Sequence, residues 1–209
     1  MRKKLIYAIN QLERIIYEPL FDQGYVDKNH AWDYVSYSFD HFLTHLKEAK
    51  KITSKRKVKF LDVGCGLGTK VCLASSFFDS YGIELNSKYY KVAKDVNTPR
   101  KFHTYGRYED RKGADCIFKE DALNFDYNPY DVIYFFRPLS DEALQKQLEQ
   151  RIFKTCRPGT IIIPIYSQST FPSYIRHLPT PSKELYIKIK DDQRAQQVNI
   201  KVKRLFSGI

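Results

Sequence analysis

The sequence lacks the long apolar run of a membrane-spanning helix. None of its hydrophobic stretches approaches the roughly 18 residues that such a helix needs. Charged and polar residues also interrupt the basic stretch at the N-terminus, which therefore lacks the apolar core of a secretory signal peptide. We expect a cytoplasmic protein with no membrane partner.

Cysteine is scarce, and its spacing argues against two kinds of stabilising site. The four cysteines form no CxxC pair, and the sequence has no HxH or HExxH motif and no carboxylate cluster. Free buried thiols are therefore expected in place of a disulfide framework or a structural zinc site. The same absences predict that the protein uses no catalytic metal.

Glycine and proline are each present only nine times among 209 residues, which is too few for an extended disordered tract. Hydrophobic residues make up 43% of the chain and aromatic residues 15%, a composition typical of a globular protein with a substantial core. The length suits one full-sized domain. Because glycine is scarce, a local cluster of glycines indicates a place where the backbone has a special requirement.

Positive charge is what the sequence has in excess. The formal net charge is +11, and seven Lys and Arg side chains stand in residues 47–59 against one acid, Glu48. Such a run is either a solvated helix end with its linker or a contact for the phosphate backbone of a nucleic acid.

The order of apolar patterns predicts a parallel sheet wrapped by helices. Helical spacing predicts two helices, at 3–17 and about 30–50, in an N-terminal region, 1–57, that caps the site of the following domain, 58–209. Within that domain the predicted strands are 58–64, 80–85, 114–120, 130–136 and 160–166, and the predicted helices are 69–78, 87–97 and 140–156. Alternating residues at 183–190 and 197–205 predict a closing antiparallel hairpin.

A glycine-rich loop follows the first predicted strand. The stretch "LDVGCGLGTK" contains Gly64, Gly66 and Gly68. At the carboxyl end of a strand in an open parallel sheet, such a loop lets the backbone approach a ligand. The spacing does not fit the GxxxxGK[ST] phosphate loop. It also departs from the dinucleotide pattern GxGxxG, because Thr69 stands where the last glycine belongs.

This loop, with the acid Asp62 before it, resembles the first motif of the class I S-adenosylmethionine-dependent methyltransferases. In that family an acid at the end of the second strand binds the ribose hydroxyls, and "YGIEL" supplies Glu84. An acid after the third strand accepts from the adenine amino group, and "KEDALNF" supplies Asp121 followed by Ala122. The stretches "YDVIYFF" and "CRPGT" match the family's fourth strand and the turn before its fifth, so the resemblance covers roughly residues 30–209.

The resemblance implies a Rossmann-like α/β fold. Its seven-stranded, mostly parallel sheet has helices on both faces, a C-terminal antiparallel hairpin and an N-terminal helical extension. It also implies S-adenosyl-L-methionine as cofactor and S-adenosyl-L-homocysteine as product. The residues that it assigns to the cofactor are Asp62, Gly64, Cys65, Gly66, Gly68, Glu84, Leu85, Asp121, Ala122 and Phe135. For Cys65 the assignment concerns the backbone, because strand packing explains a small buried thiol.

The end of the fourth predicted strand, "FFRPL" at 135–139, indicates where the methyl acceptor binds. Amino-methylating nucleic-acid enzymes of the family carry [DNS]-P-P-[YFW] at this place. Pro138 is retained, but Arg137 cannot accept a hydrogen bond from an amino group and Leu139 offers no aromatic ring, which argues against methylation of adenine N6 or cytosine N4. Arg137 and Pro138 are the acceptor-side candidates. Arg137 either clamps a phosphate or carboxylate or forms a structural ion pair with an acid such as Asp141.

The acceptor stays open between RNA, a protein and a small molecule. The basic charge slightly favours RNA and is compatible with a protein, whereas a small molecule calls for a lid, which the N-terminal helices and residues 167–182 could form. Tyr34, Tyr37 and His41, on the predicted capping helix, are further candidates for the site. A module that binds S-adenosylmethionine without catalysing transfer is the alternative from a different class.

Overall fold

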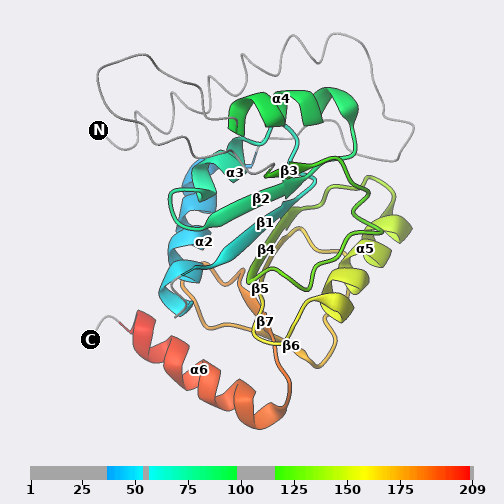
Figure 1. Ribbon diagram of the computed structural model, residues 1–209. Helices are drawn as coiled ribbons and strands as arrows, with labels where there is room; N and C mark the ends of the chain where they lie inside the picture. Colours follow the sequence, from blue (N-terminus) through cyan, green and yellow to red (C-terminus); the bar gives the residue numbers. More distant parts are fainter. Residues whose placement is uncertain (1–36, 54–56, 98–115, 208–209) are drawn as a thin grey trace, which may run out of the picture.

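The computed structural model describes residues 37–53, 57–97 and 116–207 (Figure 1). The predicted helix at 3–17 and the first part of the second predicted helix, with Tyr34, lie outside the described residues. The division of the chain at residue 58 stays a prediction.

Seven strands form one sheet in the order β3-β2-β1-β4-β5-β7-β6. Their bounds are Lys59–Val63 for β1, Asp79–Ile83 for β2, Ile117–Phe118 for β3, Val132–Phe136 for β4, Ile161–Ile165 for β5, Ile175–His177 for β6 and Tyr186–Lys188 for β7. Strands β1 to β5 are parallel, while β7 runs antiparallel to both β5 and β6. The Rossmann-like sheet is thus confirmed. Its strand order reverses between β1 and β4, at the kind of switch point where open α/β sheets bind ligands.

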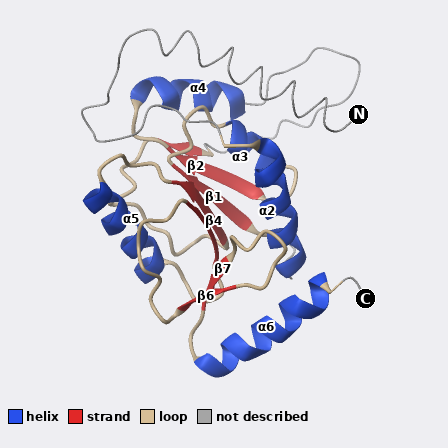
Figure 2. Cartoon of the chain, turned by 180° about the vertical axis from the view of Figure 1, so that it is seen from behind, coloured by secondary structure: helices blue, strands red, loops and turns tan. Residues whose placement is uncertain are grey.

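Helices cover both faces of this sheet (Figures 1 and 2). Their bounds are Phe39–Ile52 for α2, Thr69–Ala74 for α3, Ser87–Asn97 for α4, Glu142–Thr155 for α5 and Asp192–Phe206 for α6. One buried cluster joins Phe42 and Leu46 of α2 to Tyr134 of β4. A second cluster joins Leu148 of α5 to Ile133, the neighbour of Tyr134 that points to the other face. Burial on both faces explains why the parallel strands are continuous apolar runs.

The predicted closing hairpin is wrong in its second strand. Residues 197–205 belong to α6, and β7 pairs instead with β6, which lies inside the segment predicted as a lid. Val198, Val202 and Phe206 recur at helical spacing and pack against the core. Ile200, which completed the apparent strand alternation, is 53% exposed. The helical period prevails because it places three apolar side chains on the core at once.

Candidate functional site

The glycine loop adopts a backbone conformation that L side chains rarely take. The φ angles of Gly64, Gly66 and Gly68 are +71°, +53° and +71°. The loop is tied to β2, because the amides of Gly64 and Cys65 both donate to the carbonyl of Ile83, at 3.0 and 2.9 Å. Glycine is therefore required here by conformation, as the sequence motif predicted.

Two of these glycines also allow close approaches. A Cβ added at Gly64 would lie 2.5 Å from Cβ of Pro138, in the segment that follows β4. A Cβ added at Gly68 would lie 2.9 Å from Cα of Ala93 in α4 and 2.6 Å from Nδ2 of Asn97. The loop after β1 thus touches the segment after β4, which brings the predicted cofactor and acceptor residues together at one edge of the sheet.

Glu84, directly after β2, places its carboxylate beside the glycine loop. Its Oε2 accepts from the amide of Gly66 at 2.9 Å, and its Oε1 accepts from the amide of Asn86 at 2.8 Å. Each oxygen of this half-buried carboxylate has two lone pairs and can accept more than one hydrogen bond. Leu85, the next residue, is 43% exposed and presents an apolar surface beside it. This arrangement fits a polar ligand that carries a hydroxylated ring.

Asp121 and Ala122 follow β3, the strand next to β2. Oδ1 of Asp121 accepts from the amide of Leu123 at 2.9 Å, and Oδ2 accepts from the side-chain amide of Asn124 at 2.9 Å. The carbonyl of Ala122 accepts from the hydroxyl of Tyr127 at 2.7 Å. Asp121 therefore shapes its own turn, and the half-buried carboxylate lies at the same sheet edge as Glu84.

Three of the predicted cofactor residues have buried side chains: Asp62 is 3% exposed, Cys65 5% and Phe135 0%. The Cys65 thiol packs against Gly82, since a Cβ added at Gly82 would lie 2.8 Å from its sulfur. Burial, helped by the charges of Asp62 and Glu84, raises the pKa of Cys65, so the thiol stays neutral. Phe135 belongs to the core under α5, so only its backbone can face a ligand.

The acceptor-side candidates lie just beyond β4. Arg137 is half-buried and has a positive φ of 35°, and Pro138 rests against Gly64. Asp141, the acid considered as a partner for Arg137, caps α5 by accepting from the amide of Leu144 at 2.8 Å. Glu142, in the first turn of α5, has a lowered pKa. The main cause is its hydrogen bond with the Lys146 side chain, and the charge of Arg137 contributes more weakly. Arg137 therefore lies close enough to the start of α5 to act on its charges.

A polar cluster joins the start of α2 to the segment before β7. The hydroxyl of Tyr37 lies 3.0 Å from Nε2 of His45, and the same nitrogen lies 2.8 Å from Oε2 of Glu184. Burial and, more weakly, the charge of Glu184 raise the pKa of Tyr37, so its phenol stays protonated at neutral pH. His41 is exposed on the same helix.

Replacing His45 with glutamine is expected to flatten the acid side of the stability profile. Burial, followed by repulsion from His41, lowers the pKa of His45 from 6.5 to about 4. Its Nδ1 is buried without a hydrogen-bond partner among the described residues, so a proton there is poorly accommodated. Between pH 6.5 and 4 the unfolded chain binds a proton that the folded chain does not, and the free energy of unfolding falls as pH falls, by up to about 3 kcal/mol.

Urea titrations of the parent and His45→Gln proteins at several pH values test this expectation. The variant should lose less stability between pH 6.5 and 4 than the parent, whatever its absolute stability at neutral pH. Parallel profiles for the two proteins would show that His45 titrates normally.

Comparisons with known proteins find sequence similarity to methyltransferases. No protein-family model matches the chain. The sterol 24-C-methyltransferase of Candida albicans is 24% identical over 136 residues, which are 64% of this chain and 33% of that relative. The chain thus spans about a third of the length of the curated relatives that it matches. This sequence similarity agrees with the glycine loop and the strand order, both of which the resemblance implied. The chain is thus similar in sequence motifs and strand order to the class I S-adenosylmethionine-dependent methyltransferases.

Two solved methyltransferase structures are similar to the chain at low sequence identity. An RNA methyltransferase from Salinibacter ruber, in complex with S-adenosyl-L-homocysteine, is 15% identical with a TM-score of 0.47, covering 73% of this chain and 90% of that one. An amino pentose methyltransferase from Micromonospora echinaspora, bound to S-adenosylmethionine, is 16% identical with a TM-score of 0.48, covering 78% and 61%.

The described residues contain neither a cluster of metal ligands nor a helix suited to a membrane. Among them, no three His, Cys, Asp or Glu side chains gather where they could hold a metal ion. No described helix combines the length and the apolar character needed to cross a membrane.

Proposed function

We propose that this protein transfers a methyl group from S-adenosyl-L-methionine to an acceptor, with RNA as the favoured acceptor class. The observation that carries the proposal is the placement of Glu84 against Gly66 at the switch point of the sheet. A carboxylate beside a bare loop offers acceptors for two ribose hydroxyls, while the loop offers backbone to the methionyl end of the cofactor. Glu84 and Asp121, at the ends of neighbouring strands, would hold its ribose and adenine.

The remaining cofactor assignments follow the same edge. Gly64, Gly66 and Gly68 would lie beside the methionyl end, with the buried Asp62 ordering the loop from within β1. Leu85 would support the adenosine through its exposed apolar side chain. Ala122 continues the turn that Asp121 forms, and Cys65 and Phe135 would contribute backbone alone.

Positioning is the main chemical task in this reaction. The bound cofactor supplies an electrophilic methyl group on a sulfonium with a good leaving group, so holding the acceptor in line accounts for most of the catalysis. The contact between Gly64 and Pro138 fixes the segment after β4 against the glycine loop. Arg137, the neighbour of Pro138, would then bind an anionic group of the acceptor through its guanidinium.

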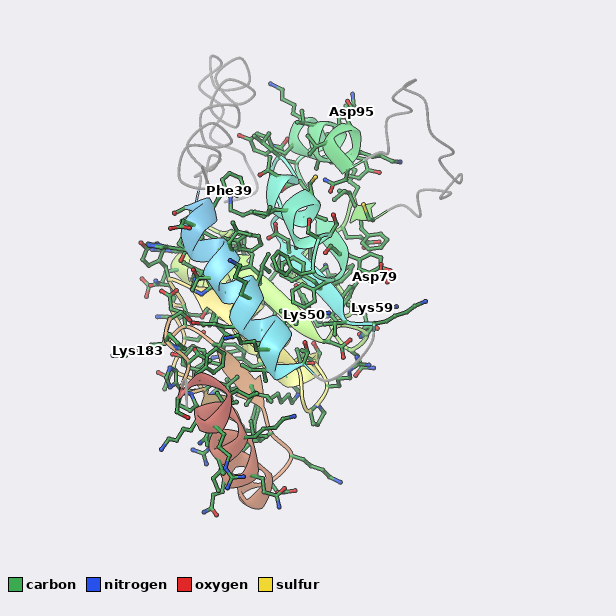
Figure 3. All side chains as sticks on the ribbon, turned by 90° about the vertical axis from the view of Figure 1, so that its left-hand side faces the viewer. Phe39, Lys50, Lys59, Asp79, Asp95 and Lys183 are labelled. Carbon is green, nitrogen blue, oxygen red and sulfur yellow. The ribbon has the colours of Figure 1, made fainter. Side chains whose placement is uncertain are left out.

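RNA is favoured by exposed basic side chains on two helices that are distant in sequence and in contact in the fold. Lys47, Lys50 and Lys51 are exposed in the last turns of α2, and α6 packs beside that helix end (Figure 3). Nζ of Lys51 lies 5.1 Å from the ring centre of Phe206, near the end of α6. Helix α6 adds three further exposed basic side chains, Lys201, Lys203 and Arg204. The predicted basic run is thus extended by α6, although Lys55 and Arg56 lie outside the described residues.

Label transfer from methyl-labelled S-adenosylmethionine into fractionated extract tests this function. We expect time-dependent label in the RNA fraction, sensitive to ribonuclease. Label that appears only in protein or in small molecules would overturn the choice of RNA while leaving the transferase activity. A chain that binds the cofactor and labels none of the fractions would be a binding module.

Replacing Lys47, Lys50 and Lys51 together with glutamine is expected to reduce the salt dependence of RNA binding. Each lost phosphate contact lowers the slope of log affinity against log salt by about 0.7 to 0.9, so the triple variant should lose roughly 2 from the slope. The measurement is filter binding of bulk transfer RNA over a range of salt. A matched control replaces the three exposed lysines of α4, Lys88, Lys91 and Lys94. Equal losses for the two variants would mean that the α2 face is not the binding surface.

A further inference from the structure

Two residues with left-handed backbone stand side by side at the acceptor edge of the sheet. Arg137 follows β4 with φ +35°, and Tyr166 follows β5 with φ +56°. The two strands are parallel neighbours, and their last registered pair is Phe136 with Ile165, so Arg137 and Tyr166 occupy the next position of each strand. Non-glycine residues hold such conformations only where the surroundings enforce them, and they concentrate at functional sites.

A buried pair of side chains on α5 binds the segments that follow these two residues. Glu149 is 0% exposed, and its carboxylate accepts from the hydroxyl of Ser167 at 2.8 Å, the amide of Gln168 at 3.0 Å and the amide of Ser169 at 2.7 Å. These are the three residues that follow Tyr166. A carboxylate buried to this degree is stable only when hydrogen bonds compensate for its lost hydration.

The same pair reaches the segment after β4. Gln145, also 0% exposed, donates through Nε2 to Oε1 of Glu149 at 2.8 Å and accepts through Oε1 from the amide of Leu139 at 3.0 Å. One connected set of hydrogen bonds therefore fixes both segments that carry the left-handed residues. The register of β4 and β5 places Arg137 beside Tyr166, and α5 holds the segments that follow them.

The side chain of Tyr166 offers an aromatic surface at this edge. It is 67% exposed, and its ring centre lies 5.6 Å from that of Phe136, whose ring in turn lies 5.1 Å from that of Tyr37. Aromatic faces stack on planar rings, and a guanidinium binds phosphate. Leu139 stands after β4 where the [DNS]-P-P-[YFW] motif has an aromatic residue. Tyr166, at the end of β5, provides an aromatic ring at this edge instead.

We propose that Arg137 and Tyr166 form an acceptor subsite for a planar ring that carries a phosphate, and that Gln145 and Glu149 position it. This inference rests on the proposed transferase function and names the ligand class of its acceptor side. Tyr166 stacks on the ring, Arg137 binds the phosphate, and the two α5 residues act through the backbone segments that they hold.

Uridine 5′-monophosphate is a suitable probe, because a pyrimidine nucleotide presents a ring and a phosphate and differs from the adenosine of the cofactor. Its affinity is measured by NMR titration of the full chain saturated with S-adenosyl-L-homocysteine. We expect saturable binding, weakened roughly tenfold by Tyr166→Ala, little changed by Tyr166→Phe, and weakened when uridine replaces the nucleotide. Tyr174→Ala, at another exposed tyrosine, is the matched control.

Glu149→Gln tests the positioning role. The glutamine amide would place N–H donors against the backbone N–H groups that donate to the carboxylate. We therefore expect the nucleotide affinity to fall about as far as in Tyr166→Ala. The affinity for S-adenosyl-L-homocysteine should stay unchanged. Ser167→Ala removes one donor to the carboxylate and should show a smaller effect with the same selectivity. An equal loss of affinity for the two ligands would mean a merely structural role.

The two proposals fail in distinguishable ways. Intact S-adenosyl-L-homocysteine binding without nucleotide binding, or with unchanged nucleotide binding in Tyr166→Ala, would overturn the subsite alone. Absence of S-adenosyl-L-homocysteine binding to the parent protein would overturn the proposed function itself.

Discussion

Glu84→Ala is expected to weaken S-adenosyl-L-homocysteine binding by about a hundredfold or more. The substitution removes the carboxylate that we propose as the acceptor for two ribose hydroxyls, and hydrogen bonds to charged groups contribute about 1.5 to 3 kcal/mol each. It also removes the group that accepts from the amides of Gly66 and Asn86, so the glycine loop loses an anchor. Equilibrium binding of the labelled product to the parent and variant proteins measures the effect.

Two control variants separate ligand contact from general damage. Asp79→Ala removes an exposed acid from the other end of β2, where its carboxylate accepts from the hydroxyl of Tyr81 at 3.0 Å, and should leave the affinity unchanged. Glu84→Gln keeps an acceptor for the loop without the charge and should fall between the parent and Glu84→Ala. If Glu84→Ala, folded by circular dichroism, binds within a few-fold of the parent, Glu84 does not hold the ribose.

Gly68→Ala is expected to lower the free energy of unfolding by about 3 kcal/mol. A φ of +71° strains any L side chain, by about 1 kcal/mol for alanine. The new methyl group would also meet Cα of Ala93 at 2.9 Å and Nδ2 of Asn97 at 2.6 Å. The backbone of α4 must shift to relieve this overlap, and overpacking of this kind costs about 1 to 3 kcal/mol.

Gly159→Ala is the matched control for Gly68→Ala. Gly159 also has a positive φ, +92°, but a Cβ there would meet nothing within 4 Å. Its substitution should therefore show the conformational strain alone, about 1 kcal/mol. Urea denaturation of both variants gives the comparison. Equal destabilisation would show that α3 and α4 separate without cost, and that the close approach at Gly68 is dispensable.

Local patterns in the sequence were sufficient for most of the sheet and its helices. Strands β1, β4 and β5 are apolar runs that end at turn residues, and α4 spans the predicted residues 87–97. Asp141 caps α5, as one of the two N-cap residues that the pattern at 140–141 allowed. Helix α3 ends at Ala74 instead of residue 78, because the chain turns there to enter β2.

The geometry of the proposed acceptor side could be predicted only in part, because it depends on pairs of residues that are distant in sequence. Arg137 was identified from its place after β4, but the sequence gives no sign that Tyr166 is its neighbour. That relation follows from the register of two strands joined by a helix. Glu149 likewise has the appearance of an exposed acid on an amphipathic helix. Its burial becomes visible only when the amides of Gln168 and Ser169 are brought to it in three dimensions.

Calorimetric titration of S-adenosyl-L-homocysteine into the intact chain tests the central claim most directly. If the loop at Gly64 to Gly68, with Glu84 and Asp121, is a cofactor site, the titration should saturate at one molecule per chain with a dissociation constant in the micromolar range, about −8 kcal/mol. The parent nucleoside adenosine should bind more weakly, because it lacks the methionyl end that we propose to lie beside the glycines. A folded protein that shows no saturable heat at product concentrations up to about 1 mM, weaker than about −4 kcal/mol, would contradict the assignment.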